Sequence, residues 1–371
     1  MKRLATILAL LGALAAAPAA KAADPFYGIV PQTALTQTET DRMARGGIKS
    51  MRVALAWYLI NPSEGSFNWA PVDQVVEIAA RSRIEMFPFL YGTPGWVAPA
   101  PETLPINTPR QRVAWANLLR AAVERYGPGG TFWAANPTVP VRPIRKWQAW
   151  NEENFFYFTK PASPGRYGQL LKLTARVLRT EDPGARVILG GLFGDPKQSP
   201  PRAMDATDFL DRLYRVRGIK AAFDGVALHP YAASARKLRP LVEGLRRVMI
   251  RHGDRRTGLY ITEMGWGSQA NSNVSFEKGP RGQARELRLA YTYLHGNRRR
   301  LNVKQVFWFA WKDAPASPCS FCDSVGLFHR GATLRPKPAW FEFVRFTGGT
   351  ASAASSPLQN PVCAPLDLLC D

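Results

Sequence analysis

The sequence predicts an α/β fold, a (β/α)8 TIM barrel formed by one large domain. Three observations favour this class. Eight apolar runs of β type follow one another, helical patterns or long loops separate them, and the 371 residues are 46% hydrophobic, enough for one large core. The runs predict strands at residues 26–30, 49–55, 84–90, 144–150, 186–190, 223–228, 258–262 and 305–309.

Two of the intervening helices carry clear start signals. Thr108 is a typical N-cap residue, Pro109 suits the first helical turn, and Gln111 stands at the capping-box position. Ser163 and Pro164 open a second helix in the same way. Both segments continue with apolar residues at helical spacing, so each helix is expected to pack one face against the sheet.

The two ends of the chain differ in composition from the predicted barrel, residues 23–346. Lys2 and Arg3 precede an apolar run and an A-x-A cleavage site at residues 20–22, so residues 1–22 are predicted to be a signal peptide. An uncleaved anchor is the alternative, although the apolar run is short for a membrane span. Residues 347–371 form a tail rich in Gly, Ala, Ser and Pro with two cysteines. The mature protein is therefore expected to be secreted or otherwise extracytoplasmic.

The chain is strongly basic. Its formal net charge is +21, and removal of Lys2, Arg3 and Lys21 with the signal peptide leaves 21 − 3 = +18. Such a charge attracts anionic polysaccharide, nucleic acid or membrane surfaces. The basic residues are spread along the sequence, which favours a generally arginine-rich surface over a dedicated nucleic-acid site. No nucleic-acid partner is expected.

All four cysteines lie late in the chain. They are Cys319, Cys322, Cys363 and Cys370. The first two could form half of a zinc site, but the second pair lacks the close spacing of metal ligands. An exported chain with an even number of cysteines more often forms disulfides, so bridges 319–322 and 363–370 are favoured. Spacing alone does not fix the connectivity.

Two glutamates stand at the predicted ends of separate strands. Glu152 follows the aromatic-rich fourth run, and Glu263 ends the seventh. Barrel enzymes keep catalytic groups at the carboxyl ends of their strands, and a pair of carboxylates is what cleavage of a glycosidic bond requires. Each could instead be a surface or salt-bridged carboxylate, and Glu153 competes with Glu152 for the same role. If Glu153 is near, its charge should raise the pKa of Glu152.

Other polar residues at strand ends could support this pair. Asn151 could hold a sugar hydroxyl. His229 and Tyr231 follow the sixth run, and Arg52 lies inside the second. A cation in a barrel interior needs a partner, and a catalytic carboxylate would supply one. A lone histidine is by default a packing residue, which is the alternative for His229.

Aromatic residues also gather at strand ends, where they could stack on sugar rings. Candidate substrate contacts are Trp57, Trp96, Trp308 and Trp311. Core packing is the alternative for several of them, and strand alternation places Trp308 and Trp311 on opposite faces. The sequence contains no phosphate-binding loop, Ser-His-Asp order or metal-ligand constellation, so neither a cofactor nor a catalytic metal is expected.

Taken in order, these motifs resemble those of clan A glycoside hydrolases over about residues 26–346. The Trp-Asn-Glu-Glu-Asn segment at 150–154 is similar to the acid/base motif of that clan, with Glu153 replacing the usual proline, and Ile-Thr-Glu-Met-Gly-Trp at 261–266 resembles its nucleophile motif. The resemblance implies that Glu152 is the acid/base and Glu263 the nucleophile. It further implies a hydroxyl-binding, supporting or platform role for Asn151, Arg52, His229, Tyr231, Trp308 and Trp311.

The nearest resemblance is to the family 39 group of β-xylosidases and α-iduronidases, followed by the family 5 group. Together with the predicted signal peptide, it predicts a secreted retaining glycosidase that acts on a polysaccharide or oligosaccharide. A monomer is expected. The substrate could itself be acidic, given the net charge. The alternative is a non-catalytic barrel that binds anionic cell-surface polysaccharide. The sugar, its linkage, and exo or endo action stay open.

Overall fold

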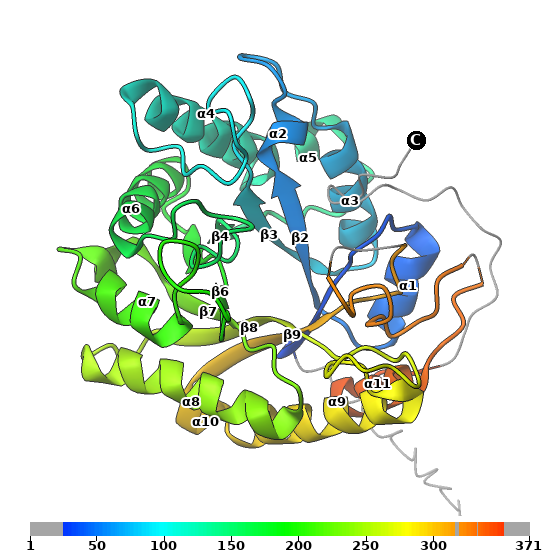
Figure 1. Ribbon diagram of the computed structural model, residues 1–371. Helices are drawn as coiled ribbons and strands as arrows, with labels where there is room; N and C mark the ends of the chain where they lie inside the picture. Colours follow the sequence, from blue (N-terminus) through cyan, green and yellow to red (C-terminus); the bar gives the residue numbers. More distant parts are fainter. Residues whose placement is uncertain (1–24, 316–318, 332, 352–371) are drawn as a thin grey trace, which may run out of the picture.

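The predicted (β/α)8 barrel is confirmed by the structure, a computed structural model that describes residues 25–315, 319–331 and 333–351. Figure 1 shows the strands in the middle of the molecule with the helices around them. The strands are β1 (Tyr27–Val30), β2 (Ser50–Ala56), β3 (Glu85–Tyr91), β4 (Lys146–Ala149), β5 (Arg186–Leu189), β6 (Leu192–Phe193), β7 (Gly225–His229), β8 (Gly258–Met264) and β9 (Val303–Phe309).

All strand pairings in this sheet are parallel. The order is β5-β4-β3-β2-β1-β9-β8-β7-β6, and an additional pairing of Ile188 in β5 with Gly225 in β7 closes the barrel. The short strand β6 was not predicted, because two residues are too few to show a pattern. It continues from β5 and pairs Phe193 with His229 at the end of β7. Because the strands are parallel, their carboxyl ends meet at one mouth.

Helices connect the strands and cover the barrel. They are α1 (Gln37–Arg45), α2 (Trp57–Ile60), α3 (Ala70–Arg81), α4 (Pro109–Tyr126), α5 (Thr131–Ala135), α6 (Pro164–Glu181), α7 (Ala206–Tyr214), the 3-10 helix η1 (Ile219–Ala222), α8 (Ala235–Arg251), α9 (Gly279–Gly296), α10 (Arg298–Leu301) and α11 (Pro338–Thr347). No described helix is long and apolar enough to cross a membrane.

The predicted helix starts are confirmed. At the start of α4, the Thr108 hydroxyl accepts from the Gln111 amide, and the Gln111 side chain accepts from the Thr108 amide, at 3.2 and 3.4 Å. The Ser163 side chain caps α6 by accepting from the Arg166 amide. These bonds satisfy amides that have no partner within the helix.

Aromatic side chains fill the barrel interior below the mouth. Phe87 and Phe307 meet there with ring centroids 5.5 Å apart. Gly28 makes room for them, since a Cβ at this position would stand 2.4 Å from the Phe307 ring. A larger apolar cluster fills the space between strands and helices. The barrel interior is thus filled by side chains, and a ligand could reach the strand ends only at the mouth.

The predicted bridge between Cys319 and Cys322 is present. It lies in the segment between β9 and α11. The second predicted pair, Cys363 and Cys370, lies outside the described residues, as does the predicted signal peptide, residues 1–22.

Candidate active site

The turn after β4 brings Glu152 to the barrel mouth. Trp150 and Glu152 have φ angles of 77° and 39°, in the left-handed region that ordinary residues seldom adopt. These φ angles end β4 at Ala149, one residue earlier than predicted. In the turn that follows, the Glu152 amide donates to the Gly190 carbonyl at 3.2 Å. Next to it, Gly191 has a φ of +88°, and a Cβ there would stand 2.2 Å from the His229 ring. The chain is shaped so that Glu152 and His229 can meet.

Glu152 and Glu263 face each other across the mouth. One carboxylate oxygen from each and one ring nitrogen of His229 all lie within 4.8 Å of one another. The two residues are 6% and 8% exposed, so both are largely buried but neither is sealed. Carboxyl groups about 5 Å apart are characteristic of retaining glycosidases, whereas inverting enzymes need about 6.5–9.5 Å to admit a water molecule.

Arg52, on β2, connects β4 and β8 from inside the barrel. Its fully buried guanidinium donates to Glu263, to Asn151 Oδ1 at 2.6 Å and to Gln148 Oε1 at 2.6 Å. It also lies over the Phe89 ring, 3.9 Å from the centroid. The buried cation therefore has the carboxylate partner that the sequence predicted, with two amide acceptors satisfying its other donors. Asn151 binds Arg52 and is only 3% exposed.

His229 and Tyr231 each contact one of the glutamates. His229 Nδ1 is 2.8 Å from Glu152 Oε1, and its Nε2 is 3.0 Å from the Thr262 hydroxyl. The Tyr231 hydroxyl donates to Glu263 Oε2 at 2.9 Å. Thr262 also accepts from the Gln148 side chain at 3.3 Å. His229 thus lies against both glutamates and not in a separate part of the core.

These surroundings give the two glutamates different proton affinities. Burial raises the pKa of Glu152 well above its ordinary value, and the charge of Glu263 raises it further. Burial also raises the pKa of Glu263, but Arg52 and the Tyr231 hydroxyl lower it again. When the pair shares one proton, that proton therefore belongs on Glu152. Burial and Arg52 lower the pKa of His229 well below its ordinary value, so the imidazole is neutral near pH 7.

Glu153 points away from the mouth. It is fully buried, and neither carboxyl oxygen makes a hydrogen bond of normal geometry within the described residues. Gly190 lies against it, since a Cβ there would stand 2.4 Å from Glu153 Oε2. Its charge raises the pKa of Glu152, as predicted, although less than burial and Glu263 do. Glu152, and not Glu153, reaches the site.

Three of the four tryptophans predicted to contact the substrate are buried in the core instead. Trp57, Trp308 and Trp311 have no exposed surface, and their indole N–H groups donate to Asn61, to the Val325 carbonyl and to Glu39. A fully buried ring offers no face to a sugar. Trp96 is half-buried and packs edge-on against Trp57, 6.3 Å away.

The residue that the sequence analysis missed on β9 is Phe309. It is 9% exposed, and its ring centroid is 6.3 Å from that of Tyr231. Strand alternation from Gln305 would have found it, because every second residue faces the interior. The same alternation would have found Gln148 on β4, which contacts Arg52.

Glu152, His229 and Glu263 also have the spacing of a metal site. Their donor atoms, however, are already paired with Arg52, Tyr231, Thr262 and one another. A cation would have to displace Arg52 from Glu263. The arrangement fits an acid and nucleophile pair better than a metal centre.

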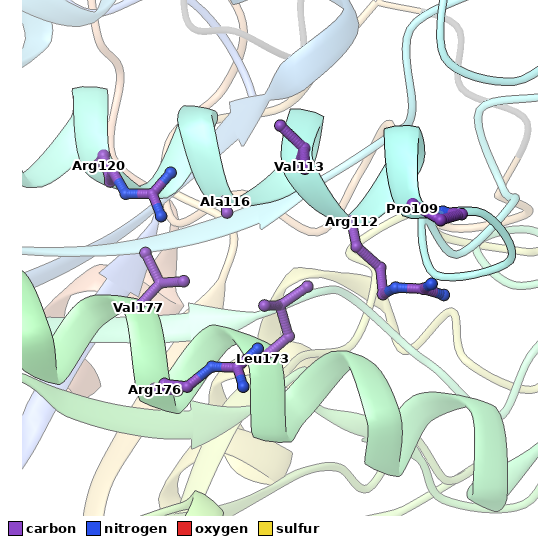
Figure 2. Close-up of a pocket in the computed structure, with 8 residues that line it drawn as sticks. All are labelled: Pro109, Arg112, Val113, Ala116, Arg120, Leu173, Arg176 and Val177. Carbon is purple, nitrogen blue, oxygen red and sulfur yellow. The ribbon is translucent and has the colours of Figure 1, made fainter.

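A pocket of about 400 Å³ lies between α4 and α6. Figure 2 shows it on the outer surface of these helices, lined by Arg112, Arg120 and Arg176 around the apolar Val113 and Val177. It contains none of the groups described above. We therefore place the chemistry at the strand ends.

Comparisons with known proteins agree with this arrangement. The family model of glycoside hydrolase family 42, described as β-galactosidase, matches residues 30–123, a segment that contains Arg52 but neither glutamate. A family 39 glycoside hydrolase from Bacteroides cellulosilyticus WH2 has a similar structure, with a TM-score of 0.65 and 19% identity over 88% of this chain and 64% of its own. The resemblance to glycoside hydrolases is confirmed. No curated protein sequence matches the chain.

Two further glycoside hydrolase structures are similar to this chain, with lower TM-scores. A monomeric β-xylosidase from Caulobacter crescentus CB15 has a TM-score of 0.61 and 18% identity, over 86% of this chain and 68% of its own. The intracellular xylanase TsXylA from Thermoanaerobacterium saccharolyticum has a TM-score of 0.57 and 13% identity, over 87% and 96%. The chain thus spans less than two thirds of the length of the Bacteroides structure. At these identities the likeness establishes the shared barrel alone.

Proposed function

We propose that the protein is a secreted retaining glycoside hydrolase, with Glu152 as acid/base and Glu263 as nucleophile. The observation that carries this proposal is the pair of facing carboxyl groups, whose nearest oxygens lie within 4.8 Å. That spacing suits a double displacement. Export rests on the predicted signal peptide, residues 1–22, and is tested by N-terminal sequencing of the protein released by its host.

In the first step, the Glu263 carboxylate attacks the anomeric carbon while Glu152 gives its proton to the departing oxygen. Arg52 and Tyr231 hold Glu263 ionised and oriented for this attack. Neutral His229 accepts a hydrogen bond from protonated Glu152 through Nδ1 when its Nε2–H donates to Thr262. The product is a glycosyl ester on Glu263 and a free leaving group.

In the second step, Glu152 is an anion and takes a proton from water. The resulting hydroxide attacks the same carbon and releases Glu263 as a carboxylate. Covalent attachment has meanwhile neutralised Glu263, which removes one cause of the raised pKa of Glu152. Glu152 is therefore a weaker acid before the attachment and a stronger one after it, as its two roles require.

The substrate is proposed to be an oligosaccharide or polysaccharide. Structures with the same barrel are named as xylosidase and xylanase, so xylosides are the first to try. The net charge of +21 for the full chain also suits an acidic polymer, and it is the observation behind the alternative, a non-catalytic barrel that binds anionic polysaccharide. That alternative predicts salt-sensitive binding without cleavage.

Covalent trapping tests the proposal most directly. The protein is incubated with 2-deoxy-2-fluoro glycosides of different configurations and then digested for peptide mapping. We expect the label on Glu263, and turnover of the matching aryl glycoside should fall at least a thousandfold in Glu152→Gln and Glu263→Gln. Glu124→Gln, on the exposed face of α4, is the matched control and should retain full activity. Label on another residue, or full activity in either catalytic variant, would overturn the assignment.

A further inference from the structure

The turn that carries Glu152 continues into a run of aromatic residues, Phe155-Phe156-Tyr157-Phe158. The ring centroids of Phe156 and Tyr157 are 4.4 Å apart in a stacked arrangement, and Phe155 packs against Phe193 of β6 at 4.8 Å. Tyr157 is 63% exposed, while its neighbours Phe155 and Phe156 are half-buried. Tyr157 therefore presents an aromatic ring to solvent above two half-buried rings, and such a ring can stack on the C–H face of a sugar.

This aromatic segment is held firmly to the barrel. The buried Asn154 side chain donates to the carbonyls of Phe193 and Met204 at 2.8 and 2.7 Å, and its oxygen accepts from the Phe193 amide at 2.8 Å. The Phe155 amide donates to the Glu152 carbonyl at 2.8 Å. The Arg202 guanidinium lies 4.1 Å from the Phe156 centroid. The backbone that carries the rings is thus held in place before any ligand arrives, which lowers the entropy cost of binding on them.

The same rings lead directly to the proposed nucleophile. Phe193 contacts Tyr231, with centroids 6.1 Å apart, and Tyr231 donates to Glu263. The aromatic path from Tyr157 through Phe155 and Phe193 therefore begins at the surface and reaches Tyr231, the partner of Glu263. At its inner end it contacts groups that would surround the reacting sugar, so a sugar chain in the mouth would lie along it.

We propose that Tyr157, supported by Phe155 and Phe156, is a binding platform for a sugar ring one or more units beyond the cleaved bond. The platform follows Glu152 directly, and Glu152 protonates the departing oxygen, so the platform belongs to the leaving-group side. Its ligand is a neutral β-linked sugar chain, whose C–H faces stack on aromatic rings. The assignment to the leaving-group side rests on the proposed function, whereas the binding of a sugar chain does not.

Affinity electrophoresis in gels that contain neutral soluble polymers tests the platform without requiring catalysis. Arabinoxylan, glucomannan and mixed-linkage β-glucan are suitable probes, because their neutrality removes any contribution of the basic surface. We expect at least one polymer to retard the wild-type protein and Tyr157→Ala to bind it about tenfold more weakly. Tyr157→Phe keeps the ring and should bind like wild type. Phe341→Ala removes a 50% exposed aromatic ring on α11, away from the mouth, and should also bind like wild type.

Absence of retardation by all three polymers would overturn the platform, and so would equal binding by wild type and Tyr157→Ala or an equal loss in Phe341→Ala. Failure of the proposed function has a different signature, namely Tyr157-dependent binding without hydrolysis. If hydrolysis occurs, Tyr157→Ala should lower kcat/KM about tenfold for an oligosaccharide but leave an aryl glycoside of the same sugar unchanged. Equal losses on both substrates would overturn the leaving-group assignment.

Discussion

Replacing Glu153 by glutamine should flatten the dependence of stability on pH. Glu153 is fully buried, and its two carboxyl oxygens lack hydrogen-bond partners of normal geometry within the described part of the chain. Burial raises its pKa from 4.5 to about 8, although the Tyr167 hydroxyl, the Gly190 amide and the charge of Arg52 act in the opposite direction. Conversely, the charge of Glu153 raises the pKa of Glu152, because the two carboxyl groups repel one another.

Stability should fall as the pH rises, because the pKa of Glu153 is higher in the folded state than in the unfolded state. The folded protein holds the Glu153 proton more tightly, so its stabilising contribution is complete below pH 4.5 and is lost as the pH rises to about 8. The difference of 8 − 4.5 = 3.5 pKa units corresponds to a ceiling of about 5 kcal/mol. Local relaxation and water entry reduce that ceiling, so we expect roughly 2–4 kcal/mol between pH 5 and pH 8.

Glutamine has the shape of the protonated acid and no charge at any of these pH values. The two proteins should therefore differ by no more than about 1–2 kcal/mol at pH 5, and the variant should be the more stable by roughly 2 kcal/mol or more at pH 8. Urea unfolding followed by tryptophan fluorescence at half-unit steps from pH 5 to pH 9 measures this difference. Parallel stability curves for the two proteins across that range would refute the assignment of a buried, neutral Glu153.

Three further outcomes are expected. Tyr231→Phe removes a hydrogen-bond donor to Glu263, so the pKa of Glu263 should rise. In a pH–rate measurement, the acidic limb of the kcat/KM profile should then move up by about one pH unit, and an unmoved limb would contradict the contact. Thr108→Ala removes the N-cap of α4 and should lower the free energy of unfolding by about 1 kcal/mol in urea, while Ser163→Ala should do the same for α6. Replacing Cys319 and Cys322 together by serine opens a very short loop and should cost under about 2 kcal/mol in thermal unfolding, since a larger loss would mean that the bridge holds more than its own segment.

The strands and the two glutamates were predictable because they depend on local pattern. Continuous apolar runs predict the eight main strands, and the carboxyl ends of parallel strands meet at one mouth, which brings Glu152 and Glu263 together. The choice between Glu152 and Glu153 was not predictable from pattern. It depends on the positive φ angles at Trp150 and Glu152, which begin where strand alternation ends.

The aromatic contacts were harder to predict, because a tryptophan suits a sugar site and a packed core equally well. Trp308 lies among buried apolar residues between sheet and helices, whereas its neighbours Phe307 and Phe309 belong to the barrel interior. Residue type pointed to Trp308, but the strand's alternation decides which side chain faces the interior. The platform at Tyr157 was missed for another reason, since it lies in a turn where no periodicity applies.

Arg52 shows how the fold and the proposed chemistry depend on one another. A single guanidinium on β2 contacts Gln148 on β4, Asn151 in the turn after β4, and Glu263 on β8. Without Glu263 ionised, this fully buried cation would have no charged partner, and without Arg52 the burial of Glu263 would favour its protonated form. The buried Arg52 therefore favours the ionised form of Glu263, the form that the proposed nucleophile needs. Since only one of two facing buried carboxyl groups can readily carry a charge, the same constraint leaves the proton on Glu152, where protonation of a leaving group needs it.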